Sequence, residues 1–177
     1  MRVGIVGFGH LGKSLAKGLI LKQIVSKNEI YILAKSENTI KQAKDEYGVC
    51  VCENINELIE ASDIIFFVIK SNVFEELCNQ TDKDLLESKL LVSFMAGMTI
   101  RKIQERLGDV HITRAMPSIA IDRAEGVIAY TMTNNMCINQ IFNALGYAFE
   151  VEECNIEKVT AFVACGLGFA AYILDSF

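Results

Sequence analysis

The chain has 177 residues, of which 51% are hydrophobic and 22% are charged, and this balance excludes a disordered, collagen-like or low-complexity protein. Its 17 basic and 22 acidic residues give a formal net charge of −5 without a run of Lys or Arg, so we expect no nucleic-acid partner. Six cysteines lie scattered through apolar segments and the N-terminus does not resemble a secretory leader, which predicts a cytoplasmic location. With two histidines in the chain, no zinc-binding spacing is present.

Short β-branched segments alternate with longer segments of helical periodicity along most of the chain. Six strands are expected first, at Val3–Val6, Glu29–Leu33, Val49–Cys52, Asp63–Ile69, Lys89–Phe94 and Val110–Arg114. The helices expected between them are Leu11–Lys22, Thr39–Tyr47, Ile55–Ala61, Val73–Gln80 and Ile100–Leu107. A strand at Gly126–Met132, a helix at Asn139–Leu145 and a strand at Ala148–Glu152 follow. The pattern predicts an α/β fold with a doubly wound, mostly parallel sheet.

The first expected strand leads directly into a glycine-rich loop and a helix. Gly7, Gly9 and Gly12 satisfy G-x-G-x-x-G in the strand-to-helix context that a dinucleotide-binding loop requires. The first glycine allows a tight turn, the second lets backbone approach a pyrophosphate, and the third lets helix and strand pack closely. The helix N-terminus then faces the phosphates. The loop residues expected to bind the cofactor are Gly7, Phe8, Gly9, His10, Leu11 and Gly12.

The same stretch also satisfies G-x-x-x-x-G-K-S, the phosphate loop of nucleoside triphosphatases, with Lys13 and Ser14 in the key places. Such an enzyme also needs an acidic residue at the end of an apolar strand to help hold magnesium. The candidate strands end instead in Lys70, Phe94 and Arg114. Dinucleotide binding is therefore favoured, and a phosphotransferase remains an alternative.

The end of the second expected strand bears on the kind of dinucleotide. An NAD site places Asp or Glu there, about 20 residues past the loop, to bind the ribose hydroxyls. This chain has Ala34, Lys35 and Ser36 at that point, followed by Glu37. A cation and a hydroxyl suit a 2′-phosphate, so NADP is favoured over NAD.

The last part of the chain, Val159–Leu174, contains 16 residues without a charge. This is shorter than the roughly 20 residues of a membrane-spanning helix and contains Gly166 and Gly168, so we expect no membrane. A helix that is apolar all round must otherwise be covered. We therefore expect a partner subunit to lie against it.

Several short segments resemble, in order, those of one enzyme family. They are Ala61-Ser62-Asp63 with Phe67-Val68-Ile69-Lys70, then Val92–Ile100, Arg114-Ala115-Met116-Pro117, Glu125-Gly126, and Val151-Glu152-Glu153 with Val159-Thr160-Ala161. Together they resemble the pyrroline-5-carboxylate reductase family over nearly the whole chain. The resemblance implies a Rossmann domain at residues 1–152 and the first helix of a helical, dimer-forming domain at residues 153–177.

The resemblance also implies an activity and its site residues. Hydride would pass from NADPH to the C=N carbon of a cyclic imino acid, and the partners would be this small substrate and a second copy of the chain, bound through the C-terminal helix. The cofactor contacts that it adds to the glycine loop are Lys35, Ser36, Asn54, Val68, Lys70, Ala96, Gly97, Met116 and Pro117. The substrate contacts that it implies are Glu153, Thr160, Cys165 and Gly166.

The chain departs from the family most in the substrate loop. Where the family has T-A-L-S-G-S-G-P-A-Y, this chain has T-A-F-V-A-C-G-L-G-F from Thr160 to Phe169. The change removes two hydroxyls and a proline that fixes a turn. A catalytically silent NADP-binding protein is therefore the second hypothesis. Arg114 is either an anion partner near the cleft or a member of an ion pair at a strand end.

Overall fold

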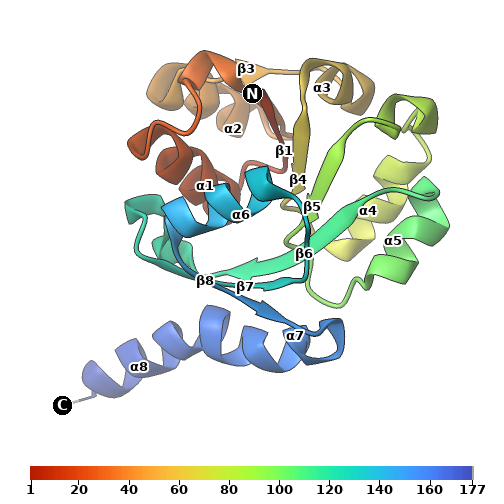
Figure 1. Cartoon of the computed structure of the whole chain (residues 1–177). Helices are drawn as coiled ribbons and strands as arrows, with labels where there is room; N and C mark the ends of the chain where they lie inside the picture. Colours follow the sequence, from red (N-terminus) through yellow and green to blue (C-terminus); the bar gives the residue numbers. More distant parts are fainter. Residues whose placement is uncertain (177) are drawn as a thin grey trace.

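The strands are short apolar runs, and the innermost ones are buried on both faces, as expected for parallel strands between two layers of helices. A computed structural model describes residues 1–176, and the side chains of residues 164, 165 and 167 lie outside that description. The strands are β1 (Val3–Val6), β2 (Ile30–Leu33), β3 (Cys50–Val51), β4 (Ile64–Phe67), β5 (Leu90–Ser93), β6 (Ile112–Pro117), β7 (Gly126–Thr131) and β8 (Gly146–Val151). They form one eight-stranded sheet with the order β3-β2-β1-β4-β5-β6-β7-β8 (Figure 1).

The strand order reverses at β1, which pairs in parallel with β2 on one side and with β4 on the other. Val3 is in register with Ile30 of β2 and with Ile64 of β4. A doubly wound sheet binds its ligand at the carboxyl ends of the strands beside this point of reversal. At the far edge β7 runs antiparallel to β6, and β8 runs parallel to β7.

Two layers of helices cover the sheet (Figure 1). The helices are α1 (His10–Leu21), α2 (Glu37–Gln42), α3 (Ile55–Ala61), α4 (Ser71–Cys78), α5 (Ile100–Leu107), α6 (Met136–Leu145), α7 (Glu153–Thr160) and α8 (Gly166–Leu174). Short 3-10 segments lie at η1 (Lys27–Glu29), η3 (Lys83–Leu86) and η4 (Ile119–Arg123), and π-helical turns at η2 (Ala43–Tyr47) and η5 (Ala161–Cys165).

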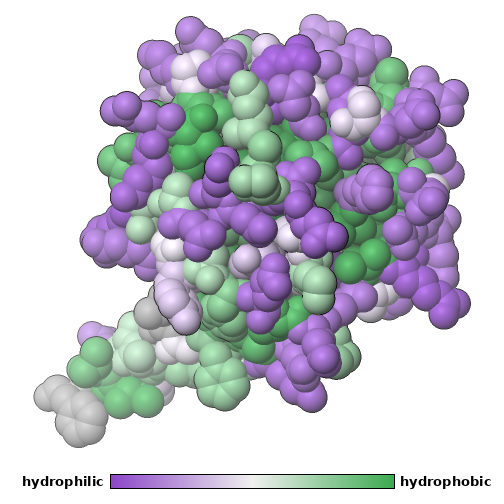
Figure 2. Space-filling view, in the orientation of Figure 1, coloured by the Kyte–Doolittle hydropathy of each residue, from purple (hydrophilic) through white to green (hydrophobic). Residues whose placement is uncertain are grey.

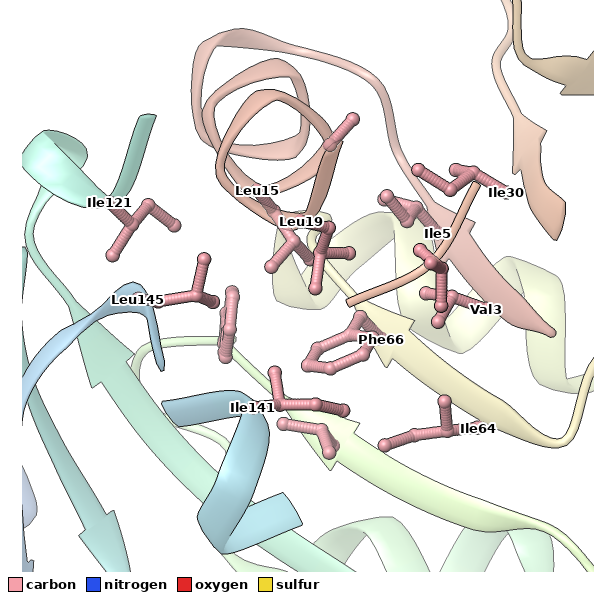
Figure 3. Packing of buried hydrophobic residues seen from close by; sticks show 14 of the residues in the cluster. Val3, Ile5, Leu15, Leu19, Ile30, Ile64, Phe66, Ile121, Ile141 and Leu145 are labelled. Carbon is pink, nitrogen blue, oxygen red and sulfur yellow. The ribbon is translucent and has the colours of Figure 1, made fainter. Parts of the chain in front are cut away.

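Each face of the sheet has its own apolar core. On one face Leu15 and Leu19 of α1 and Ile141 of α6 pack around Phe66 of β4 (Figure 3). On the other face α3, α4 and α5 pack against the sheet, with Leu58, Phe74 and Ile103 among the buried side chains. The two cores hold the carboxyl ends of β1, β2 and β4 in fixed positions.

The expected fold class is confirmed, and every expected strand and helix is present. Val3–Val6, Ile55–Ala61 and Ile100–Leu107 have the expected bounds, and the other elements have shifted ends. Helix α6 begins at Met136, three residues before its expected start, because the Asn135 side chain caps it by accepting from the backbone N–H groups of Cys137 and Ile138. The 3-10 segment η4 between β6 and β7 is not among the expected elements. The residue after it, Ala124, is left-handed with φ 57°, and β7 then runs back along β6.

The apolar helix expected at Val159–Leu174 is present and begins earlier, at Glu153. Helices α7, η5 and α8 follow one another without a break, because the residues lack the proline that would fix a turn. Ile156 and Val163 are buried, whereas Phe162, Phe169 and Tyr172 are exposed. Helix α8 projects from the body of the molecule and presents an apolar surface (Figures 1 and 2).

The segment Glu153–Leu174, with a hydropathy of 1.5 over its most apolar window, is long and apolar enough to cross a membrane by length and composition. Soluble proteins also contain such helices, in positions where other protein surfaces cover them. The exposed apolar side chains of α8 therefore need another surface to cover them. The length and hydropathy of the helix alone do not identify that surface.

Candidate dinucleotide-binding site

A cleft of about 460 Å³ opens at the carboxyl ends of β1, β2 and β4, at the point where the strand order reverses. The lining residues come from the glycine loop, the ends of β2 and β3, and one face of α4. They are Val6, Gly7, Phe8, Gly9, Leu33, Ala34, Lys35, Ser36, Thr39, Glu53, Asn54, Ile55, Ile69, Val73, Leu77 and Gln80. The position is the one at which a doubly wound sheet binds a dinucleotide.

The three glycines of the loop have three different surroundings. Gly7 has φ +97°, and a Cβ atom there would lie 2.5 Å from the carbonyl oxygen of Val68. A Cβ atom on Gly12 would lie 2.2 Å from the carbonyl oxygen of Gly7. A Cβ atom on Gly9 would meet nothing within 4 Å. Gly7 and Gly12 are therefore required by the fold, whereas the space at Gly9 is open toward the cleft.

The first turn of α1 suits an anion. Gly9 is the N-cap of this helix and has no side chain to cap it, and the first turn contains no acidic residue. The backbone N–H of Lys13 donates to the carbonyl of Gly9, so the N–H groups before it have no helical acceptor. Free N–H groups and the positive end of the helix dipole together suit a pyrophosphate. The loop residues therefore fit the phosphates of a dinucleotide.

The cationic side of the cleft lies after β2. The Lys35 ammonium lies 2.7 Å from a carboxylate oxygen of Glu76 on α4, and both side chains are exposed. This ion pair lowers the pKa of Glu76, first through the hydrogen bond from Lys35. Ser36 caps α2 by accepting from the backbone N–H of Thr39. Asn54 caps α3 in the same way, through the N–H of Glu57 at 3.0 Å.

Lys13 and Ser14 do not face the loop as a triphosphatase requires. The Lys13 ammonium donates to the side-chain oxygen of Gln42, the last residue of α2, and Ser14 is buried within α1. In addition, β2 lies directly beside β1, as in a dinucleotide-binding sheet. The geometry thus favours the dinucleotide interpretation of the loop over the phosphotransferase.

The remaining expected cofactor residues lie along the same end of the sheet. His10, Leu11 and Gly12 form the first turn of α1, and the Phe8 ring is buried, where it packs edge-to-face on Tyr47 with ring centroids 5.2 Å apart. Val68 and Lys70 follow β4, Ala96 and Gly97 follow β5, and Met116 and Pro117 are buried in β6. Sequence reasoning missed the contribution of α4 and of the turn after it, although Val73 and Leu77 have the spacing of one helix face.

Arg114, within β6 and three residues before its end at Pro117, joins this strand to α7. Its side chain is 1% exposed, and its guanidinium lies 3.3 Å from the Glu153 carboxylate and also contacts Glu157. The same two carboxylates accept from the chain between β5 and α5: Glu157 from the N–H of Gly97 in the loop at 2.9 Å, and Glu153 from the N–H of Ile100, the first residue of α5, at 2.6 Å. Arg114 is therefore an ion-pair residue, the second of its two expected roles, and the network fixes α7 against the loop.

The four expected substrate residues all belong to the C-terminal helical segment. Glu153 is held by Arg114, and the Thr160 hydroxyl donates to the carbonyl of Ile156 at 2.7 Å. Gly166 begins α8, and the side chain of Cys165 lies outside the described residues. Of the described residues among them, Glu153, Thr160 and Gly166 do not line the cleft at the glycine loop.

Comparison with known proteins is consistent with this site. The family model described as "NADP oxidoreductase coenzyme F420-dependent" matches residues 2–97, which include the glycine loop, the end of β2 and the loop after β5. The chain belongs to this family. Within it, the chain is 26% identical to pyrroline-5-carboxylate reductase of Staphylococcus saprophyticus over 185 residues, covering 100% of this chain and 68% of that protein. The enzyme of the same name from Aquifex aeolicus is 27% identical, over 99% of this chain and 67% of the relative.

A solved structure extends this similarity to three dimensions. Plasmodium falciparum pyrroline carboxylate reductase with NADP bound has a TM-score of 0.85 and is 26% identical, covering 99% of this chain and 67% of that one. The chain thus spans about two thirds of the length of these relatives.

Proposed function

We propose that this member of the family is an NADPH-dependent reductase of the pyrroline-5-carboxylate reductase type, which reduces the C=N bond of a cyclic imino acid. The observation that carries the proposal is the cleft at the glycine loop, with an open backbone at Gly9 and a cation at the end of β2. The names of the relatives that match the whole chain supply the substrate class.

The roles of the residues follow from their positions along the sheet. The N–H groups at the start of α1 would bind the pyrophosphate, and Lys35 and Ser36 would bind the 2′-phosphate. When bound, NADPH supplies the hydride, so the protein has to orient the cofactor and exclude water. Ala96 and Gly97 follow β5, on the other side of the reversal point from β2, and we assign them to the nicotinamide half. Met116 and Pro117, which are buried at the carboxyl end of β6, would pack against the nicotinamide half of the cofactor.

For the substrate we propose the C-terminal segment that begins at Glu153, with Thr160, Cys165 and Gly166. A specific observation favours the second candidate function, a catalytically silent NADP-binding protein. The Thr160 hydroxyl already donates to a backbone carbonyl, and the segment that replaces the family's substrate loop is helical. Backbone N–H groups inside a helix are occupied by helical hydrogen bonds.

A turnover assay separates the two candidates. With pyrroline-5-carboxylate present, the purified chain is expected to oxidise NADPH, and the rate is expected to rise with enzyme concentration. The loss of absorbance of the reduced nicotinamide measures the reaction. Omitting the imino acid is the control and should leave the absorbance constant. Tight NADPH binding without oxidation would contradict the reductase and support the silent protein.

We also propose a cytoplasmic homo-oligomer in which a second copy covers α8. The exposed apolar side chains of this helix, which include Phe169, Tyr172 and Ile173, would form the contact. Free cysteines at Cys50, Cys52, Cys78, Cys137 and Cys154 are consistent with a reducing compartment.

Light scattering after size exclusion tests the oligomer. We expect a mass at least twice that of the 19.6 kDa chain. The double substitution of Phe169→Asp and Ile173→Asp is expected to return the protein to a monomer, because it places charges in the contact. Leu21→Asp is the matched control, since Leu21 is an exposed apolar residue on α1 and should not change the mass. A monomeric wild type, or one that stays in solution only with detergent, would contradict the proposal.

A further inference from the structure

One ion pair crosses the mouth of the cleft described above. Lys35 stands at the end of β2, on one side of the opening, and Glu76 stands on α4, on the other. Val73 and Leu77 line the cleft from α4, and Glu76 lies three residues after Val73 on the same helix, so it is a neighbour of Val73 on the helix surface. The contact between the ammonium and the carboxylate, 2.7 Å long, therefore joins the two walls.

In this ion pair Glu76 binds the Lys35 ammonium, which is the group on which the choice between NADPH and NADH depends. A 2′-phosphate bound at Lys35 has to share the ammonium with the Glu76 carboxylate or displace it, and in both cases that carboxylate lies as a negative charge beside the phosphate. A ribose with a free 2′-hydroxyl meets no such repulsion. It donates a hydrogen bond, which a carboxylate accepts. In NAD sites an acidic residue at the end of β2 has this role, and β2 of this chain ends without one.

We propose that Glu76 is a specificity-determining residue that weakens NADPH binding relative to NADH, by holding Lys35 across the cleft and by placing a carboxylate beside the 2′-phosphate. The inference rests on the proposed function, because it assumes that the cleft binds a nicotinamide dinucleotide. It concerns a residue of α4 that the glycine-loop pattern does not include. Exposure limits the size of the effect, since Lys35 is 72% and Glu76 61% exposed and solvent screens the pair.

The test measures dissociation constants of NADPH and NADH by the fluorescence of the reduced nicotinamide, for the wild type and Glu76→Gln. The exposed Gln keeps the size of the side chain and removes its charge. We expect NADPH to bind about three- to tenfold more tightly to the variant, and NADH to change by no more than about twofold. The gain for NADPH should shrink as the ionic strength rises from about 0.01 M to about 0.5 M.

The matched control is Glu75→Gln, the same change at the next position of α4. Glu75 faces away from the cleft and pairs with Arg106 of α5, so the ratio of the two constants should stay at the wild-type value. Equal changes for both dinucleotides in Glu76→Gln, or weaker NADPH binding, would overturn the inference and leave the proposed function standing. A wild type that binds neither dinucleotide would overturn both.

Discussion

Gly9→Val is expected to abolish high-affinity NADPH binding while the protein stays folded. The backbone of Gly9 has φ −77° and ψ −160°, which valine adopts readily, and its Cβ position meets nothing within 4 Å. The valine side chain would instead fill the space in which a pyrophosphate approaches the loop. Forcing a group against such a side chain costs about 1–3 kcal/mol, and each lost hydrogen bond about 1 kcal/mol more. The expected loss of affinity is therefore about 100-fold.

Calorimetric titration of NADPH into the variant measures this loss, and circular dichroism with thermal melting checks the fold. Valine is a poor N-cap, so a decrease of about 1 kcal/mol in the free energy of unfolding is expected. Gly12→Ala is the informative comparison, because its new Cβ would lie 2.2 Å from the Gly7 carbonyl and should destabilise the fold itself. Unchanged NADPH affinity in a folded Gly9→Val protein would refute the assignment of the loop.

Arg114→Met is expected to lower the free energy of unfolding by about 3 kcal/mol, the largest stability effect that we predict. Removing one member of a buried ion pair costs about 3–5 kcal/mol, because the other member loses its counter-charge. We take the lower end of this range, since Glu153 and Glu157 are 34% and 47% exposed and retain some hydration. For a chain of this size the expected fall in melting temperature is about 10 °C.

Urea denaturation of Arg114→Met and of Arg101→Met provides the measurement and its control. Arg101 pairs with Glu105 four residues along α5, and 88% of its side chain is exposed. The same substitution there should change the free energy of unfolding by no more than about 0.5 kcal/mol. Adding Glu153→Gln and Glu157→Gln to Arg114→Met should recover part of the lost free energy of unfolding. The two amide side chains carry no unpaired charge, and their oxygens still accept from the backbone N–H groups of Ile100 and Gly97. Equal stability of the two Met variants would show that the Arg114 network contributes little.

The glycine loop could be predicted from sequence because its constraints are local. Gly7 needs a positive φ and Gly12 needs close contact with the strand, and both requirements fall within six residues. The parallel sheet could be predicted for a similar reason, since fully buried strands such as β1 and β4 leave continuous apolar runs. The end of β2 was also recognisable as a cationic position, from Lys35.

The partners of charged residues could not be predicted, because they lie far apart in the chain. Lys35 and Glu76 are 41 residues apart, and Arg114 is 39 residues from Glu153 and 43 from Glu157. The sequence alone left two roles open for Arg114, and its burial decided between them. The direction of β7 was also hidden, since alternation along a strand does not record whether its neighbour runs parallel or antiparallel.

The most direct test of the account is a parallel titration of NADPH, NADH and magnesium-ATP into the wild-type chain. The cleft, the exposed backbone of Gly9 and the position of Lys35 predict that a nicotinamide dinucleotide binds and that NADPH binds most tightly. The orientation of Lys13 toward Gln42 predicts that magnesium-ATP binds weakly or not at all. Tight binding of magnesium-ATP without binding of either dinucleotide would contradict the central claim.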